Sequence, residues 1–202
     1  MTYDGDFYYY PGKCKYVFAS HCKGSQEDFN ILFQRTEEEF GPVIRYISIK
    51  IHEVVIEIST NSITMDGELV TETPVDESGV LIDRIGDYVK IAYSSDIYFM
   101  WNGEDSILLK LNRNKYANQT CGMCGDFNGV RGLTYDGIEA TVVQYGNMQK
   151  RNGPVEDCPD VSPLTSTKCK NMVNGNFHKC EKMHSSLKHR GSKCSHTPID
   201  ST

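Results

Sequence analysis

Two cysteines with the spacing of a redox pair lie in the segment Cys121-Gly122-Met123-Cys124. Thiol–disulfide exchange at such a pair requires a thiolate of lowered pKa, which a helix N-terminus after a strand provides. The glycines that flank the pair disfavour a helix, so a structural disulfide staple is the other interpretation. We prefer the staple and keep exchange at Cys121 and Cys124 as an alternative.

Oxygen-bearing side chains follow directly. Asp126 and Asn128 stand at alternate positions before Gly129, a pattern typical of calcium loops, because hard cations take several oxygen ligands and glycine permits a sharp bend. Asp136 and the stretch Asp4-Gly5-Asp6 near the start offer further carboxylates for such a shell. Ordinary Asx turns are the alternative interpretation of the same residues.

Cysteine content favours an oxidising compartment. The chain has 202 residues and eight cysteines, with no obvious catalytic histidine near them. Asn118 begins the Asn-Gln-Thr acceptor of N-glycosylation, which indicates a secreted surface. The first residues lack the basic start and apolar stretch of a signal peptide, so we expect a piece of a longer secreted protein.

Charge and the lengths of apolar runs argue against a nucleic-acid-binding protein and against a membrane-spanning one. Residues 1–158 carry 14 basic and 24 acidic side chains, whereas residues 159–202 carry seven and three. An acidic body argues against a partner with a phosphate backbone, so we expect no nucleic-acid binding. No apolar run approaches the length of a membrane span.

The secondary structure that positions the cysteines and the oxygen-bearing side chains is predicted to be β-strands. Short β-branched or aromatic runs alternate with turn signals, which predicts an all-β fold. Apolar residues shift from odd to even positions after Ile51, which places a turn at His52-Glu53 because side chains alternate with period two. The strands that we expect are residues 15–19, 29–35, 43–51, 54–59, 62–65, 69–73, 80–85, 88–93, 97–101 and 107–111.

Three hairpin turns connect the later strands, at Asp66-Gly67, Gly86-Asp87 and Asn102-Gly103. Sequential hairpins form a meander, so residues 3 to about 115 are predicted to form antiparallel sheets packed face to face. We expect Trp101, the only tryptophan, to pack in this core.

Ordered blocks along the chain resemble a known family, the von Willebrand factor type D domain. The blocks are Thr2-Tyr3-Asp4-Gly5, Pro11 to Phe18, Gly86-Asp87-Tyr88-Val89, Trp101 to Asp105 and Cys121 to Gly129. The ending resembles the first D assembly of secreted gel-forming mucins, and it consists of Tyr145 to Lys150, Gly153-Pro154 and Cys158-Pro159. The resemblance covers residues 2 to about 160. It implies an antiparallel β-sandwich-like domain over residues 1–158.

The same resemblance implies a function. Such domains are non-enzymatic modules that control disulfide-linked assembly of a secreted polymer in a calcium-dependent and pH-dependent way. The implied partners are other D domains or mucin chains, joined in part through disulfides, and the implied location is extracellular.

Cysteine pairs can be carried over residue by residue. The resemblance implies disulfides Cys14–Cys158 and Cys22–Cys121. The family partner of the second motif cysteine lies just before the Thr-Tyr-Asp-Gly block, where this chain has none, so we expect Cys124 to be unpaired.

Calcium ligands carry over less completely. Asp4, Asp126 and Asn128 match positions at which the family presents calcium-binding oxygens. The remaining ligand position holds Thr134 in place of the usual Asp or Asn, and Asp136 lies two residues further on. With few carboxylates, any affinity should suit extracellular or secretory-pathway calcium.

Residues 159–202 read as a Pro, Ser and Thr-rich linker followed by a truncated or divergent start of an eight-cysteine module, which we expect to be poorly ordered. Zinc is an alternative for this tail, although the spacings match no familiar finger. Its metal-binding residue types are Cys169, Cys180 and Cys194 with His178, His184, His189 and His196.

Three functions are consistent with these sequence features. The preferred one is a structural and assembly module of a secreted mucin-like glycoprotein. The others are thiol–disulfide exchange and a stand-alone extracellular metal-binding or adhesion protein. No Ser-His-Asp grouping, phosphate loop or His-Glu-x-x-His helix stands out, so we expect no enzyme activity.

Overall fold

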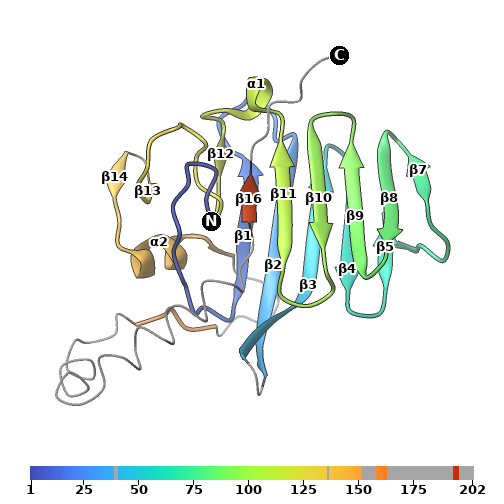
Figure 1. Cartoon of the computed structure of the whole chain (residues 1–202), viewed down its shortest axis with the longest axis horizontal. Coiled ribbons are helices and arrows are strands. Elements are labelled where there is room, and N and C mark those ends of the chain that lie inside the picture. The colour runs from blue at the N-terminus through green and yellow to red at the C-terminus, as the bar shows by residue number, and fades with distance from the viewer. Residues whose placement is uncertain (39–40, 136, 152–157, 163–192, 196–202) are drawn as a thin grey trace.

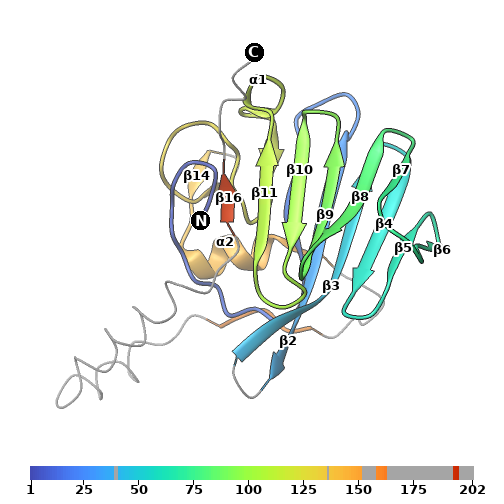
Figure 2. The same cartoon turned by 45° about the vertical axis from the view of Figure 1, so that its right-hand side comes forward.

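A computed structural model describes residues 1–38, 41–135, 137–151, 158–162 and 193–195. Two sheets lie one in front of the other, and the N-terminal segment, the loops after the second sheet and a short helix gather at one side of them (Figures 1 and 2). This arrangement confirms the predicted all-β fold. None of the helices in these described ranges is long and apolar enough to cross a membrane.

The first sheet is antiparallel and has the order β12-β1-β2-β3-β4-β5-β6, with β15 also paired to β1. Its strands are β1 (Lys15–His21), β2 (Phe29–Glu38), β3 (Gly41–Ile51), β4 (Val54–Ser59), β5 (Ile63–Met65), β6 (Glu68–Leu69), β12 (Thr120–Cys121) and β15 (Lys150–Arg151).

The second sheet has the order β16-β11-β10-β9-β8-β7 and is antiparallel except where β16 pairs with β11. Its strands are β7 (Val75–Glu77), β8 (Val80–Ile85), β9 (Tyr88–Tyr93), β10 (Ile97–Trp101), β11 (Ile107–Leu111) and β16 (Lys193–Ser195). The remaining elements are the ribbon of β13 (Thr134–Tyr135) and β14 (Ile138–Glu139) and the helices α1 (Arg113–Tyr116) and α2 (Val142–Met148).

Period-two patterning explains the long strands. Ile47 and Ile49 of β3 lie opposite Ile58 and Ile56 of β4, and all four are fully buried. The chain reverses at His52, whose φ is +50°, so the predicted turn between the two strands is confirmed. The parity change in the sequence is thus the consequence of a two-residue hairpin.

The core lies between the two sheets. Isoleucines of the first sheet belong to one buried cluster with the inward side chains of β8 to β11. Trp101 is 1% exposed and belongs to this cluster, as the sequence predicts.

The strands expected from the sequence differ from those in the structure where a strand is short or has no apolar face. The expected strand at residues 69–73 ends at Leu69, because Thr71 and Glu72 are both exposed and bring nothing apolar to the core. The strands β7, β12, β13, β14 and β15 and the helix α2 are not predicted at all. Each is seven residues or fewer, too short for a periodic signal.

Core burial gives a first test. Ile56→Ala should lower the free energy of unfolding by about 2–5 kcal/mol, because it removes buried methyl groups and leaves a cavity. The matched control is Ile85→Ala, at a position 48% exposed, for which we expect a change of about 0.5 kcal/mol or less. Urea unfolding followed by circular dichroism measures both, and equal losses would contradict the assigned core.

Candidate functional site at the edge of strand β1

One edge of β1 is covered by two segments from the second half of the chain, residues 120–124 and β15. β15 pairs with Lys15 and Tyr16, and β12 pairs with Ser20 and His21. Between them the Cys-Gly-Met-Cys motif supplies backbone donors. Met123 N–H donates to the Val17 carbonyl at 3.0 Å, and Cys124 N–H donates to the Phe18 carbonyl at 3.0 Å.

A β-bulge in β1 shapes this edge. Pairing with β2 passes from Val17 opposite Leu32 to Ala19 opposite Ile31, which leaves Phe18 as the extra residue. A bulge bends its strand and increases the local twist. The carbonyl of the bulged residue accepts the hydrogen bond from Cys124. The Cys-Gly-Met-Cys motif therefore hydrogen-bonds to the edge of β1 and does not begin a helix.

Gly122 makes this close approach sterically feasible. Its φ is +110°, and a Cβ at this position would lie 2.8 Å from the Phe18 carbonyl oxygen and 2.9 Å from the Ala19 Cα. Backbone atoms cannot move aside as a flexible side chain can. The buried hydroxyl of Tyr145 also donates to the Gly122 carbonyl at 2.6 Å and ties α2 to the motif.

Two disulfides connect this edge to distant parts of the chain. Cys14 is bonded to Cys158 with a Cα–Cα distance of 5.6 Å, and Cys22 is bonded to Cys121 with a Cα–Cα distance of 5.9 Å. These are the two pairs that the resemblance implies. Since Cys121 is bonded to Cys22, the two motif cysteines do not form a disulfide with each other, and nothing in this geometry supports thiol exchange between them.

The structure corrects the prediction for Cys124. Its sulfur takes part in a disulfide, and the residue is fully buried. The prediction considered only a cysteine placed before Thr2. A disulfide requires two cysteines whose Cα atoms lie about 4.4–6.8 Å apart and whose Cβ atoms face each other, whatever their order in the sequence.

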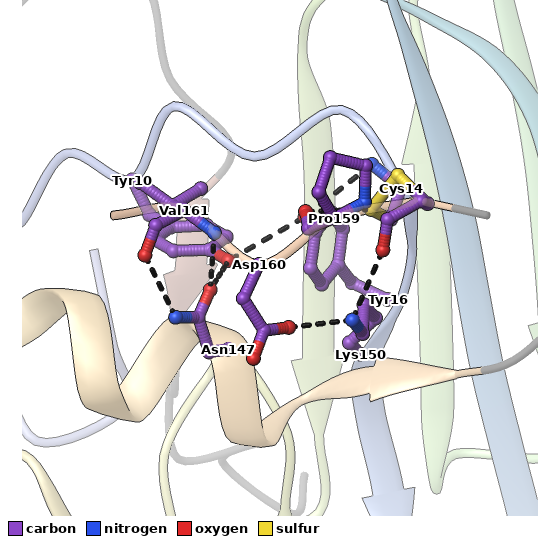
Figure 3. A network of polar contacts seen from close by, with 9 residues as sticks. Tyr10, Cys14, Tyr16, Asn147, Lys150, Pro159, Asp160 and Val161 are labelled. Atoms are coloured by element: carbon purple, nitrogen blue, oxygen red, sulfur yellow. Dashed lines mark hydrogen bonds and ion pairs between the residues drawn. A yellow bond between two sulfur atoms is a disulfide. The ribbon is translucent and has the colours of Figure 1, made fainter.

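A polar network, which we call the C-terminal clasp, holds residues 158–161 against the domain (Figure 3). The Asn147 side chain at the end of α2 donates to the Val161 carbonyl and accepts from Val161 N–H, both at 2.9 Å. The Tyr10 hydroxyl donates to the same Asn147 oxygen at 2.5 Å. An amide side chain thus imitates the hydrogen bonding of a strand.

Lys150 completes the clasp next to the disulfide. Its ammonium donates to the Cys158 carbonyl at 3.0 Å and to the Asp160 carboxylate at 2.5 Å (Figure 3). Tyr10 is fixed by close packing, because a Cβ at Gly146 would lie 2.2 Å from its ring. Asn147 and Lys150 lie in the block Tyr145 to Lys150, and Tyr10 directly precedes the block that begins at Pro11. The types and spacing of these three residues give no signal for their roles.

The predicted calcium ligands lie beside the covered edge. The Asp4 carboxylate accepts from Gly129 N–H at 2.6 Å, which joins the N-terminal block to the loop after the motif. Partial burial raises the pKa of Asp4 and the nearby charge of Asp126 raises it further, against backbone hydrogen bonds from Gly129 and its neighbours that lower it. The structure therefore brings Asp4 and Asp126 together.

Asn128 is partly engaged within its own loop. Its amide donates to the Asp126 carboxylate at 2.8 Å, and its carbonyl oxygen accepts from Val130 N–H at 2.6 Å. Asp136 lies outside the described residues. Within those ranges no group of three or more Asp, Glu, His or Cys side chains is arranged to hold a metal ion. The oxygen chemistry of Asp4, Asp126 and Asn128 still fits a hard cation.

The acceptor Asn118 is exposed at the other end of the same segment. Its φ is +58° and its side-chain oxygen accepts from the Lys23 ammonium at 3.1 Å. The cysteines and histidines predicted as a zinc group in residues 169–196 lie outside the described side chains.

This fold and this site define a β-sandwich module closed by disulfides. The family model of the von Willebrand factor type D domain matches residues 1–132, and the chain belongs to this family. It is a structural, non-enzymatic module.

The chain is similar to several mucins. It is 43% identical to human Mucin-5B and 40% identical to human Mucin-5AC over 171 residues, and 37% identical to mouse Mucin-2 over 165 residues. These matches cover 79–83% of the chain but only 3–4% of the length of each mucin.

Gly122 gives a second test. Gly122→Ala should destabilise the domain by more than Gly67→Ala, although both glycines have positive φ, because only the first would bring its Cβ against backbone atoms. The conformational penalty alone is about 1–2 kcal/mol, and overpacking adds about 1–3 kcal/mol. Thermal unfolding of both variants measures the difference, and equal penalties would show that the approach to β1 imposes no extra constraint.

A third test concerns the disulfide at the clasp. Replacing Cys14 and Cys158 together by alanine should cost roughly 4–5 kcal/mol in the chain-entropy account, because this bond closes a loop of 144 residues. Asn147→Ala should cost about 1 kcal/mol as the loss of hydrogen bonds alone. Urea unfolding without reductant compares the two, and a larger loss for Asn147→Ala would invert this order.

Proposed function

We propose that this chain is a structural and assembly module of a secreted, gel-forming mucin-like glycoprotein. The observation that carries the proposal is the similarity to three mucins over about four fifths of the chain. The partners are other D domains or mucin chains, and disulfides contribute to their association. The eight cysteines and the Asn-Gln-Thr acceptor, whose Asn118 is exposed, support an extracellular location.

The geometry suits a module within a long polymer. Cys14 and Cys158 lie 144 residues apart in the sequence, yet one covalent bond joins them. A force applied along the polymer passes from one cysteine to the other through this bond. All strands except β16 lie between these two cysteines and stay unloaded while the disulfide is intact. A domain of this kind adds little length when the polymer is stretched.

Native secretions provide the test. An antibody raised against this chain should detect it in high-mass material on a non-reducing gel, and the signal should move to lower mass after reduction. A stable monomer of the chain's own size, found without reductant, would instead favour the stand-alone extracellular protein. Turnover of a disulfide substrate that disappears in a Cys121→Ser, Cys124→Ser variant would favour thiol exchange.

Calcium is the cofactor that we propose for this module, bound by Asp4, Asp126 and Asn128. The support is that the Asp4 carboxylate lies against the loop after the motif, where it accepts from Gly129 N–H at 2.6 Å. Burial, and after it the neighbouring charge of Asp126, raises the pKa of Asp4, and a divalent cation would relieve that repulsion. Oxygen ligands of this kind suit a hard cation. Bound calcium would then join the N-terminal block to the loop of residues 126–129.

The substitution Asp4→Asn tests this site. A carboxyl whose folded-state pKa is raised adds stability at a pH below its unfolded-state pKa, and that stability is lost as pH rises through the folded-state pKa. At pH 7 without calcium, Asp4→Asn should therefore melt at a higher temperature than the unaltered chain. Added calcium should raise the melting temperature of the unaltered chain and leave the variant unchanged.

The matched control is Asp87→Asn at the exposed β8–β9 turn, which should keep the full calcium response. A calcium-induced shift of equal size in all three proteins would place the ion elsewhere. The absence of any shift would remove calcium from the proposal and leave the assembly role to the antibody experiment.

A further inference from the structure

The glycosylation acceptor Asn118-Gln119-Thr120 is built into the covered edge of β1. Asn118 N–H donates to the Phe127 carbonyl at 2.9 Å, and Gln119 N–H donates to the Tyr116 carbonyl at 3.0 Å. The Gln119 carbonyl accepts from both Cys22 N–H and Lys23 N–H, at 2.9 and 3.2 Å. The backbone of the acceptor is therefore occupied by internal hydrogen bonds.

The hydroxyl of the acceptor is also inaccessible. Thr120 is fully buried, and its hydroxyl donates to the Gly125 carbonyl at 3.0 Å. Thr120 lies in β12 opposite His21 of β1. Of Asn118 and Thr120, only Asn118 is exposed. N-glycosylation requires the hydroxyl residue two positions after the asparagine, so a transferase must engage Thr120 together with Asn118.

The next residue fixes this geometry covalently. Cys121 follows Thr120 directly and is bonded to Cys22, at the start of the segment that holds Gln119. Closing this disulfide brings Thr120 beside His21 and removes it from the reach of a transferase. Asn118 itself stays exposed in the folded domain, where its side-chain oxygen accepts from the exposed Lys23.

We propose that Asn118 accepts its glycan only before β12 pairs with β1, so that glycan transfer to Asn118 and closure of the Cys22–Cys121 disulfide compete for the same stretch of chain. This deepens the proposed function, since it rests on passage through a secretory compartment. The fraction of chains that carry the glycan then reports which of the two reactions was faster.

Glycan transfer to Asn118 and closure of the Cys22–Cys121 disulfide each require one co-reactant. A lipid-linked oligosaccharide donates the glycan: a bond forms between the Asn118 side-chain nitrogen and the anomeric carbon, the bond from that carbon to the lipid pyrophosphate breaks, and the nitrogen loses one proton. A disulfide oxidant, such as glutathione disulfide, takes the two electrons and two protons of the Cys22 and Cys121 thiols and becomes two thiols.

Glycan transfer in vitro is the first test. Purified oligosaccharyltransferase and a lipid-linked oligosaccharide are added to the full chain in two forms, one folded and oxidised, the other reduced and carboxymethylated so that it stays unfolded. Glycan occupancy is read as a mass shift that a glycosidase reverses. We expect modification of the unfolded form and at least a tenfold lower rate for the folded form, with Asn118→Gln unmodified in both. Equal rates for the two forms would overturn the proposal.

A second test measures the competition in cells. Thr120→Ser keeps an acceptor hydroxyl but weakens the acceptor, so that occupancy falls below completion. In this background Cys22→Ser should raise the occupancy, and the matched control Cys14→Ser, which removes the other disulfide, should not. Equal occupancy with and without Cys22 would contradict the proposal. This readout does not depend on calcium or on polymer assembly, so its failure and that of the proposed function are distinguishable.

Discussion

The rest of the structure follows from the need to pair the edge of β1 that faces away from β2. A strand buried in a domain must satisfy its backbone groups on both sides, because a buried polar group without a partner is costly. β2 covers one side of β1, and segments from residues 119–151 cover the other. These segments carry the motif cysteines, the glycosylation acceptor and α2, so the chemistry of the module gathers where the sheet requires hydrogen bonds.

The disulfides Cys14–Cys158 and Cys22–Cys121 and the C-terminal clasp then hold this edge in place. Cys22–Cys121 lies at the end of β1 that β12 covers, and Cys14–Cys158 lies at the end that β15 covers. Asn147 adds hydrogen bonds to Val161, beyond the second disulfide. Covalent and polar contacts therefore secure both ends of one strand.

Much of the sandwich could be predicted because its signals are local. The four strands between residues 80 and 111 pair with neighbours along the chain, and alternating apolar residues at Val80 and Ile82 or Ile107 and Leu109 mark the buried face. The covered edge gave no such signal. β12 and β15 have two residues each, too few for a period, and their pairing partner lies about 100 or more residues away.

The sequence by itself determined which residues alternate, where hairpins turn and which family the ordered blocks resemble, since these depend on neighbouring residues or on the order of motifs. The two disulfide pairs came from that resemblance and not from spacing. Only the tertiary structure decided that Cys124 is disulfide-bonded, that Tyr10 meets Asn147, and that Thr120 is buried. The physical reason is that such contacts depend on distances in space, and separation along the chain does not define them.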